Sequence, residues 1–134
     1  YKACYFHILA LHHIRASLTT EASETIAAAI VGSRLDFCNS LLAGTSVSNL
    51  ARHQRVQNTL ARVVAQKPRF CHITPVLSDL HWLPVRHRIS FKIATVTYRV
   101  LQFQQPSYLA SLIPRYVPAR ALRSSSSLSM CSRT

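Results

Sequence analysis

The segment that decides the fold is HITPVLSDLHWLPVRHRISFK, residues 72–92. It contains the single tryptophan of the chain, Trp82, followed two residues later by Pro84. Proline is well tolerated at the start of a helix, and apolar side chains recur at helical spacing after it. The segment therefore predicts a compact Trp-Pro turn in which Trp82 and Pro84 anchor a long helix that continues to Phe103.

The expected core face of this long helix is apolar and consists of Val85, Ile89, Ile93, Val96, Val100 and Phe103. Trp82 has two interpretations. An aromatic ring can stack on a nucleic-acid base, but a tryptophan set between Leu80, Leu83 and Pro84 is more often part of a core, because its burial removes a large apolar area from water. We therefore expect Trp82 to be a structural anchor.

Further helices are predicted on both sides of this segment. The first covers residues 3–17; Thr19 or Thr20 then caps a second that runs through residues 25–43 and ends at Gly44. Ser46 or Ser48 caps a third, residues 49–66, which Pro68 stops. Shorter pieces are expected at residues 74–80 and 107–112.

The chain is predicted to be all-α, a small helical bundle of about five helices. It contains only 2 glycines, which leaves few residues for tight turns, and 49% of its residues are hydrophobic, which is ample for a core. We expect a helical domain at residues 1–113. The prolines and serines of residues 114–134 predict an extended, partly disordered C-terminal tail.

The charge of the chain is strongly unbalanced. Sixteen Lys and Arg residues against four Asp and Glu residues give a net charge of +12 with neutral histidines. Such an excess repels itself unless an anion neutralises it, and nucleic acid is the most common polyanionic partner of basic proteins. An acidic membrane surface, an acidic protein partner, or a basic piece of a longer, more neutral protein remain as alternatives.

Two of the predicted helices carry a row of basic and small polar residues opposite the expected core face. In residues 49–66 the row is Arg52, Arg55, Thr59, Arg62 and Gln66. In the long helix it is Arg88, Lys92, Thr95, Arg99 and Gln102. Such rows suit contacts with backbone phosphates, although many are simply solvated faces. The candidate nucleic-acid-binding residues are therefore Arg52, Arg55, Arg62, Arg88, Lys92 and Arg99.

The sequence offers little for catalysis or metal binding. Its four acidic residues, Glu21, Glu24, Asp36 and Asp79, are too few to assemble a two-metal nucleotidyl-transfer site. The cysteines and histidines lack the paired spacing of a structural zinc site, and no Gly-rich phosphate loop is present. We expect no catalytic residue, no metal and no cofactor.

The four cysteines are far apart, which favours free thiols in a reducing compartment, the nucleus or the cytoplasm. The longest apolar run, around IAAAIV, is far too short to cross a bilayer, so no membrane-spanning segment is expected, and nucleic acid rather than a membrane is the predicted partner.

Four segments together resemble a known family. They are SRLDFCNSLLAG (33–44), HQRVQNTLARVV (53–64), HITPVLSDLHWLPVRHRISFK (72–92) and PSYLASLIPRYVPARALRS (106–124). In order and spacing they are similar to the C-terminal region, the thumb and the part just beyond it, of LINE-type non-LTR retrotransposon reverse transcriptases. The resemblance covers nearly the whole chain, from about residue 5 to residue 124.

The resemblance implies a helical, thumb-like piece of an RNA-directed DNA polymerase that grips the backbone of an RNA–DNA or other template–primer duplex. The catalytic palm aspartates of that family have no counterpart here, so the chain by itself is not expected to be an enzyme. An upstream palm domain is then a further expected partner. The alternatives are a helical protein–protein interaction module, or a decayed retroelement fragment without a selected function.

Overall fold

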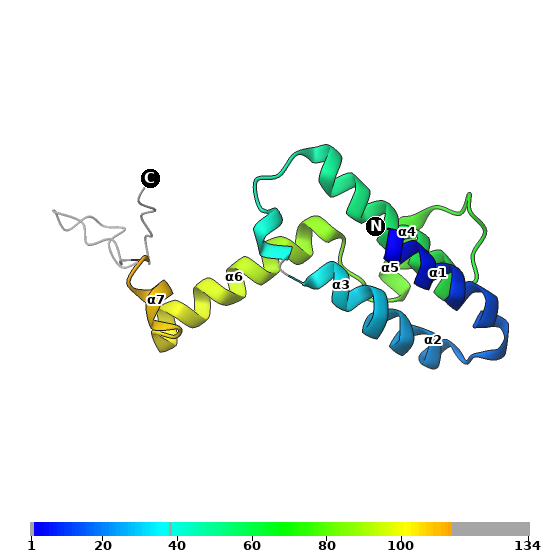
Figure 1. Cartoon of the computed structure of the whole chain (residues 1–134), viewed down its shortest axis with the longest axis horizontal. Helices are drawn as coiled ribbons and strands as arrows, with labels where there is room; N and C mark the ends of the chain where they lie inside the picture. Colours follow the sequence, from blue (N-terminus) through cyan, green and yellow to red (C-terminus); the bar gives the residue numbers. More distant parts are fainter. Residues whose placement is uncertain (1, 38, 114–134) are drawn as a thin grey trace. The chain divides into compact units, whose positions relative to one another are not determined.

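The computed structural model describes residues 2–37 and 39–113 (Figure 1). About 77% of the described residues are helical, and these residues contain no strand. Five α-helices within them have seven or more residues, which confirms the prediction of an all-α protein with about five helices. The predicted tail, residues 114–134, lies outside the described residues.

The chain divides into two compact units, the first ending at Lys92 and the second beginning at Ile93. The first unit contains α1 (Lys2–Ile14), α2 (Thr20–Ala27), α3 (Ser33–Asp36), α4 (Val47–Val64), α5 (Ile73–Asp79) and the beginning of α6 (Val85–Phe103). The remainder of α6 and the short α7 (Ser107–Ala110) belong to the second unit.

The N-termini of α2 and α4 are capped as predicted. The Thr19 hydroxyl accepts a hydrogen bond from the Ala22 N–H at 3.2 Å, and the Ser46 hydroxyl accepts one from the Asn49 N–H at 3.4 Å. These contacts satisfy N–H groups that have no partner within their own helix. The two caps fix where α2 and α4 begin.

The predicted continuous helix over residues 25–43 is wrong. A π-helical segment, Ala28–Gly32, follows α2, and α3 ends at Asp36 because Phe37 is extended, with a ψ of 118°. A 3-10 turn, Asn39–Leu42, comes next. The Asn39 side chain donates to the Asp36 carboxylate at 3.3 Å. Local side-chain hydrogen bonds of this kind make asparagine a poor helix former, which accounts for the early break.

The main core lies between α1, α4 and the segment from α2 to α3. Eight buried residues form it: Ile8, Leu11, Ala27, Val31, Leu35, Val56, Leu60 and Val64. A smaller cluster of Ala61, Val76 and Leu77 joins α5 to α4. Leu80 and Trp82 are partly buried and pack against both clusters, so the Trp-Pro turn lies where the two meet.

The ends of three predicted helices need correction. The third predicted helix ends at Val64, ahead of Pro68, because Gln66 adopts a φ of +51°. The short helix α5 begins at Ile73, so Pro75 occupies its third position, and α7 is two residues shorter than predicted. In α6, Ile93 is 39% exposed and Phe103 is 66% exposed, whereas Val85 and Ile89 are buried. The apolar face of α6 is therefore only partly used as core.

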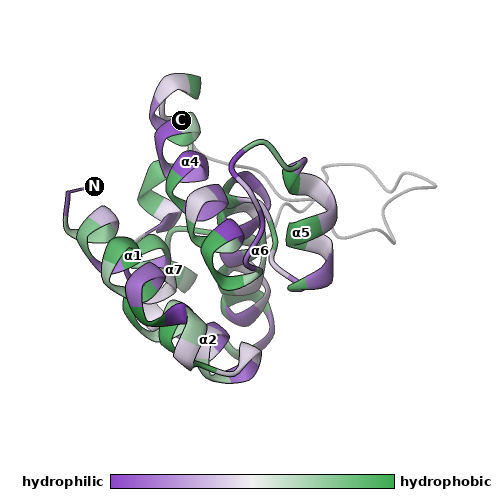
Figure 2. Cartoon of the chain, turned by 90° about the vertical axis from the view of Figure 1, so that its right-hand side faces the viewer, coloured by the Kyte–Doolittle hydropathy of each residue, from purple (hydrophilic) through white to green (hydrophobic). Residues whose placement is uncertain are grey.

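Hydrophobic residues are not confined to the interior of the first unit. Figure 2 shows them around much of α1, where Phe6 is 69% exposed and Leu9 is 57% exposed. Among the described residues, no helix is both long enough and apolar enough to cross a membrane.

Candidate functional site

The cationic row of α4 divides into two parts. Arg52 and Arg55 are exposed, and the Arg55 Nε donates only a long hydrogen bond of 3.4 Å to the Ala51 carbonyl in its own helix. Thr59, the next residue of the row, donates its hydroxyl to the Arg55 carbonyl at 2.9 Å. The two arginines can therefore present their charge to an external anion.

Arg62 occupies a different environment. It is half-buried, and its guanidinium donates to the Cys71 carbonyl at 3.3 Å, while its Nε is buried without a hydrogen-bond partner. This contact ties the end of α4 to the loop before α5. The Arg62 guanidinium is therefore less available to an external ligand than those of Arg52 and Arg55.

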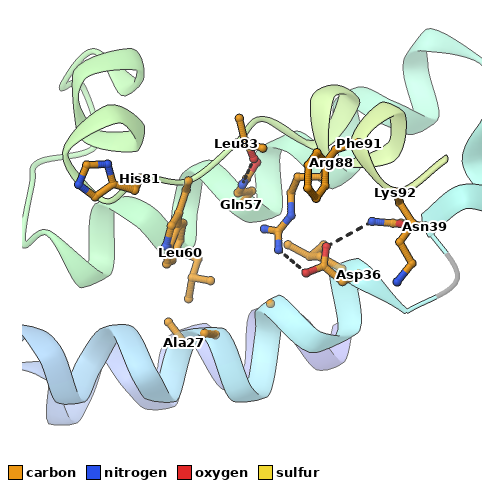
Figure 3. Close-up of a pocket in the computed structure, with 14 residues that line it drawn as sticks. Ala27, Asp36, Asn39, Gln57, Leu60, His81, Leu83, Arg88, Phe91 and Lys92 are labelled. Carbon is orange, nitrogen blue, oxygen red and sulfur yellow. Dashed lines mark hydrogen bonds and ion pairs between the residues drawn. The ribbon is translucent and has the colours of Figure 1, made fainter. Parts of the chain in front are cut away.

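The cations of α6 in the first unit also differ from each other. Arg88 is half-buried and forms an ion pair with Asp36 of α3, a residue 52 positions away in sequence (Figure 3). The Lys92 side chain is exposed and makes no hydrogen bond or ion pair with any residue in 2–37 or 39–113. Of this pair, Lys92 is the more available to a ligand.

Arg99 belongs to the second unit, where it is exposed. It lines a shallow depression together with Phe103, Gln105, Pro106 and Ser107. Arg88 and Lys92 therefore lie in the first unit, whereas Arg99 lies in the second unit.

One arginine that contributes to the net charge is removed from the surface. Arg15 is only 6% exposed, and its guanidinium donates to the carbonyls of Val64 and Leu18 at 2.8 and 2.9 Å. Its position could be read from the sequence, because Ile8, Leu11 and Arg15 follow one another at helical spacing on the buried face of α1 and its extension. The number of arginines alone does not show that Arg15 is buried.

A pocket of about 440 Å³ opens in the first unit beside the Asp36–Arg88 pair (Figure 3). Leu35, Leu60, Trp82 and Leu83 give it an apolar wall, and Asp36, Asn39, Arg88 and Lys92 give it a polar end. No local pattern in the sequence identifies this pocket, because its walls come from segments far apart in the chain.

A chain of amide hydrogen bonds supports one side of the pocket. The fully buried Gln57 donates to the Leu83 carbonyl at 2.7 Å and accepts from Gln54 at 3.0 Å. Gln54 in turn accepts from the Val85 N–H at 2.8 Å. These bonds attach the first turn of α6 to α4, so the positions of Leu83 and Arg88 are fixed by α4.

His53 lies partly buried on α4. Burial lowers the pKa of His53 below its usual value, because a partly desolvated imidazole is harder to charge. Within the part of the chain that the structure describes, no three His, Cys, Asp or Glu side chains are grouped so that they could hold a metal ion.

No protein-family model matches the chain, and comparisons with curated proteins and with solved structures find no match either.

Proposed function

We propose that this chain is a non-catalytic nucleic-acid-binding domain that contacts the backbone of a template–primer duplex. We further propose that it derives from the C-terminal part of a retrotransposon RNA-directed DNA polymerase. The retrotransposon origin rests on the four sequence segments alone. The duplex-binding function has a separate basis in the charge of the molecule.

The observation that supports binding most directly is the exposure of Arg52, Arg55 and Lys92 in a protein with a net charge of +12. Arginine forks and lysine ammonium groups bind phosphate oxygens without reading bases, which suits contact with duplexes of any sequence. Arg88 and Arg62 are secondary candidates, because Asp36 and the Cys71 carbonyl already occupy them.

The test is a salt series with an RNA–DNA hybrid duplex. Each neutralised phosphate contributes a slope of about −0.9 to the logarithm of affinity against the logarithm of salt concentration. Three contacts predict a slope of about −3, and the triple variant Arg52→Ala, Arg55→Ala, Lys92→Ala should lose most of it. Affinity that is negligible at low salt, or that does not change with salt, contradicts the proposal.

A matched control separates position from total charge. Arg34, Lys67 and Arg69 are also exposed but lie outside the two cationic rows. The triple variant Arg34→Ala, Lys67→Ala, Arg69→Ala has the same net charge as the first triple variant and should retain most of the affinity. Equal losses in both variants would mean that the rows have no special role.

A second candidate function is a helical interaction module whose partner is another protein segment, an upstream palm domain included. The supporting observation is the apolar outer side of α1, with Phe6 and Leu9 exposed. Self-association of the isolated chain that the double variant Phe6→Ser, Leu9→Ser abolishes would favour this function. A monomer that binds duplex would favour the first.

A further inference from the structure

The pocket of the first unit has two chemically different ends. Leu60 and His81 lie toward one end in Figure 3, and Leu35, Trp82 and Leu83 add further apolar surface to the lining. Figure 3 shows Asp36, Asn39, Arg88 and Lys92 gathered at the other end. A volume of about 440 Å³ lies within the range of pockets that enclose small organic ligands.

The polar end has unused binding capacity. Asn39 is only 4% exposed, and its Oδ1 accepts no hydrogen bond. A buried acceptor without a donor is costly, so a ligand donor would be favourable there once the Asn39 side chain turns this covered oxygen toward the pocket. Lys92 lines the same pocket and is exposed, which leaves its ammonium group available to an anion.

These features specify the chemistry of a ligand. It has a flat ring for the wall beside Trp82, an anionic group for Lys92, and a hydrogen-bond donor close to that anionic group for Asn39. A nucleotide meets all three requirements, because aromatic residues stack on bases, a ribose hydroxyl near the phosphate can donate to Asn39, and lysine binds phosphate.

We propose that this pocket binds a single nucleotide, with the base against Trp82 and the phosphate beside Lys92. The inference deepens the proposed nucleic-acid function, since the nucleotide would be an unpaired or terminal residue of a strand. Binding of a free mononucleotide does not require binding of a duplex, so the two proposals can be tested separately.

Asp36 opposes the phosphate in this arrangement. Its carboxylate occupies the guanidinium of Arg88, and a phosphate entering the polar end competes for the same donors. Replacement of the carboxylate removes that competition. Asp36→Asn is therefore expected to tighten nucleotide binding by about twofold to fivefold. This change in affinity corresponds to the free energy of one half-exposed ion pair.

The experiment uses the emission of Trp82, the single tryptophan of the chain, together with calorimetry on the full chain. The titrants are adenosine monophosphate, adenosine, inorganic phosphate and 2-naphthoate. We expect a saturable response to the nucleotide, a weaker one to adenosine and none to inorganic phosphate. Absence of nucleotide binding overturns the proposal, as does adenosine or 2-naphthoate binding as tightly as the nucleotide.

Two pairs of variants locate the binding. Ala28 lines the pocket and is exposed, so Ala28→Leu should fill the cavity and abolish binding, whereas Ala29→Leu, one residue outside the lining, should not. Lys92→Met should weaken binding about tenfold, the usual loss for one charge-assisted hydrogen bond, and the control Lys67→Met should leave it unchanged. Helix content measured by circular dichroism checks that each variant folds.

The outcomes also distinguish this inference from the duplex proposal. Nucleotide binding that persists in the Arg52→Ala, Arg55→Ala variant, which keeps Lys92, supports a separate pocket. Duplex binding without mononucleotide binding overturns the proposal that the pocket binds a nucleotide, and it leaves the duplex proposal standing. Equal loss in Ala28→Leu and Ala29→Leu also overturns it, because the binding would then not involve the cavity.

Discussion

The guanidinium Nε of Arg15 lies 2.8 Å from the carbonyl oxygen of Val64, which joins the end of α1 to the end of α4 across 49 residues of sequence. Val64 is the last residue of α4, and the final carbonyls of a helix have no partner within it. A buried cation there satisfies one of them and lies at the negative end of the helix dipole. Arg15 is therefore a structural residue, although it contributes to the charge that suggests nucleic acid.

We expect Arg15→Met to lower the free energy of unfolding by about 1–3 kcal/mol, because the carbonyls of Val64 and Leu18 would be left buried without donors. Urea denaturation followed by circular dichroism measures this. The control Arg34→Met changes an exposed arginine and should stay within about 0.5 kcal/mol of the wild type. Equal stability of the two variants would contradict the role given to Arg15.

The two glycines should respond to alanine in opposite directions. Gly32 has helical angles, φ −57° and ψ −49°, and a Cβ there would meet the nearest atom at 3.6 Å, an ordinary contact. Gly44 has a φ of +80°, which side chains rarely adopt. Gly32→Ala should stabilise by about 0.5–1 kcal/mol and Gly44→Ala should destabilise by about 1 kcal/mol or more. Thermal and urea unfolding of both variants test the signs.

The Asp36–Arg88 ion pair should contribute little to stability. Its side chains are 42% and 26% exposed, so water screens their attraction. A double-mutant cycle with Asp36→Asn and Arg88→Gln should give a coupling energy below about 1 kcal/mol. A coupling of several kcal/mol would mean that the pair is a main structural contact and that Asp36 cannot readily give way to a ligand.

Acidification should weaken the fold through His53. Its pKa is lowered in the folded protein by burial, so the unfolded chain binds the proton more readily. The contribution of His53 is fully present above its unfolded pKa, falls as the pH drops below about 6.5, and is lost once the pH is below the folded value. His53→Gln should therefore reduce the decrease in melting temperature between pH 7.5 and pH 5.5. An unchanged decrease would assign it to other groups.

Local signals in the sequence predict much of the helical framework. Thr19 and Ser46 mark helix starts because their hydroxyls can accept from N–H groups a few residues later, and Pro84 precedes α6 because proline suits a helix start. Such signals involve residues within one turn of each other. The chain segment alone therefore contains the information needed to recognise them.

Features that depend on distant residues were not predictable in this way. One miss was local: the spacing of residues 25–43 is helical, and this pattern outweighed the Asn39–Asp36 contact and the extended Phe37, which end the helix early. The occupation of Arg88 by Asp36 needs the packing of α3 against the start of α6, which no local pattern specifies. The pocket was missed for the same reason, since its lining is assembled only when α2, α3, α4 and α6 come together.

Leu80 and Trp82 have a consequence for how the first unit melts. The smaller cluster contains three buried residues, too few to hold α5 in place alone, and Leu80 and Trp82 pack against both this cluster and the larger one. Loosening of either cluster removes contacts from the other, so the two should come apart in a single cooperative transition. The stability of α5 therefore depends on the main core. Replacement of Leu80 or Trp82 by a smaller side chain should allow α5 to unfold separately from that core.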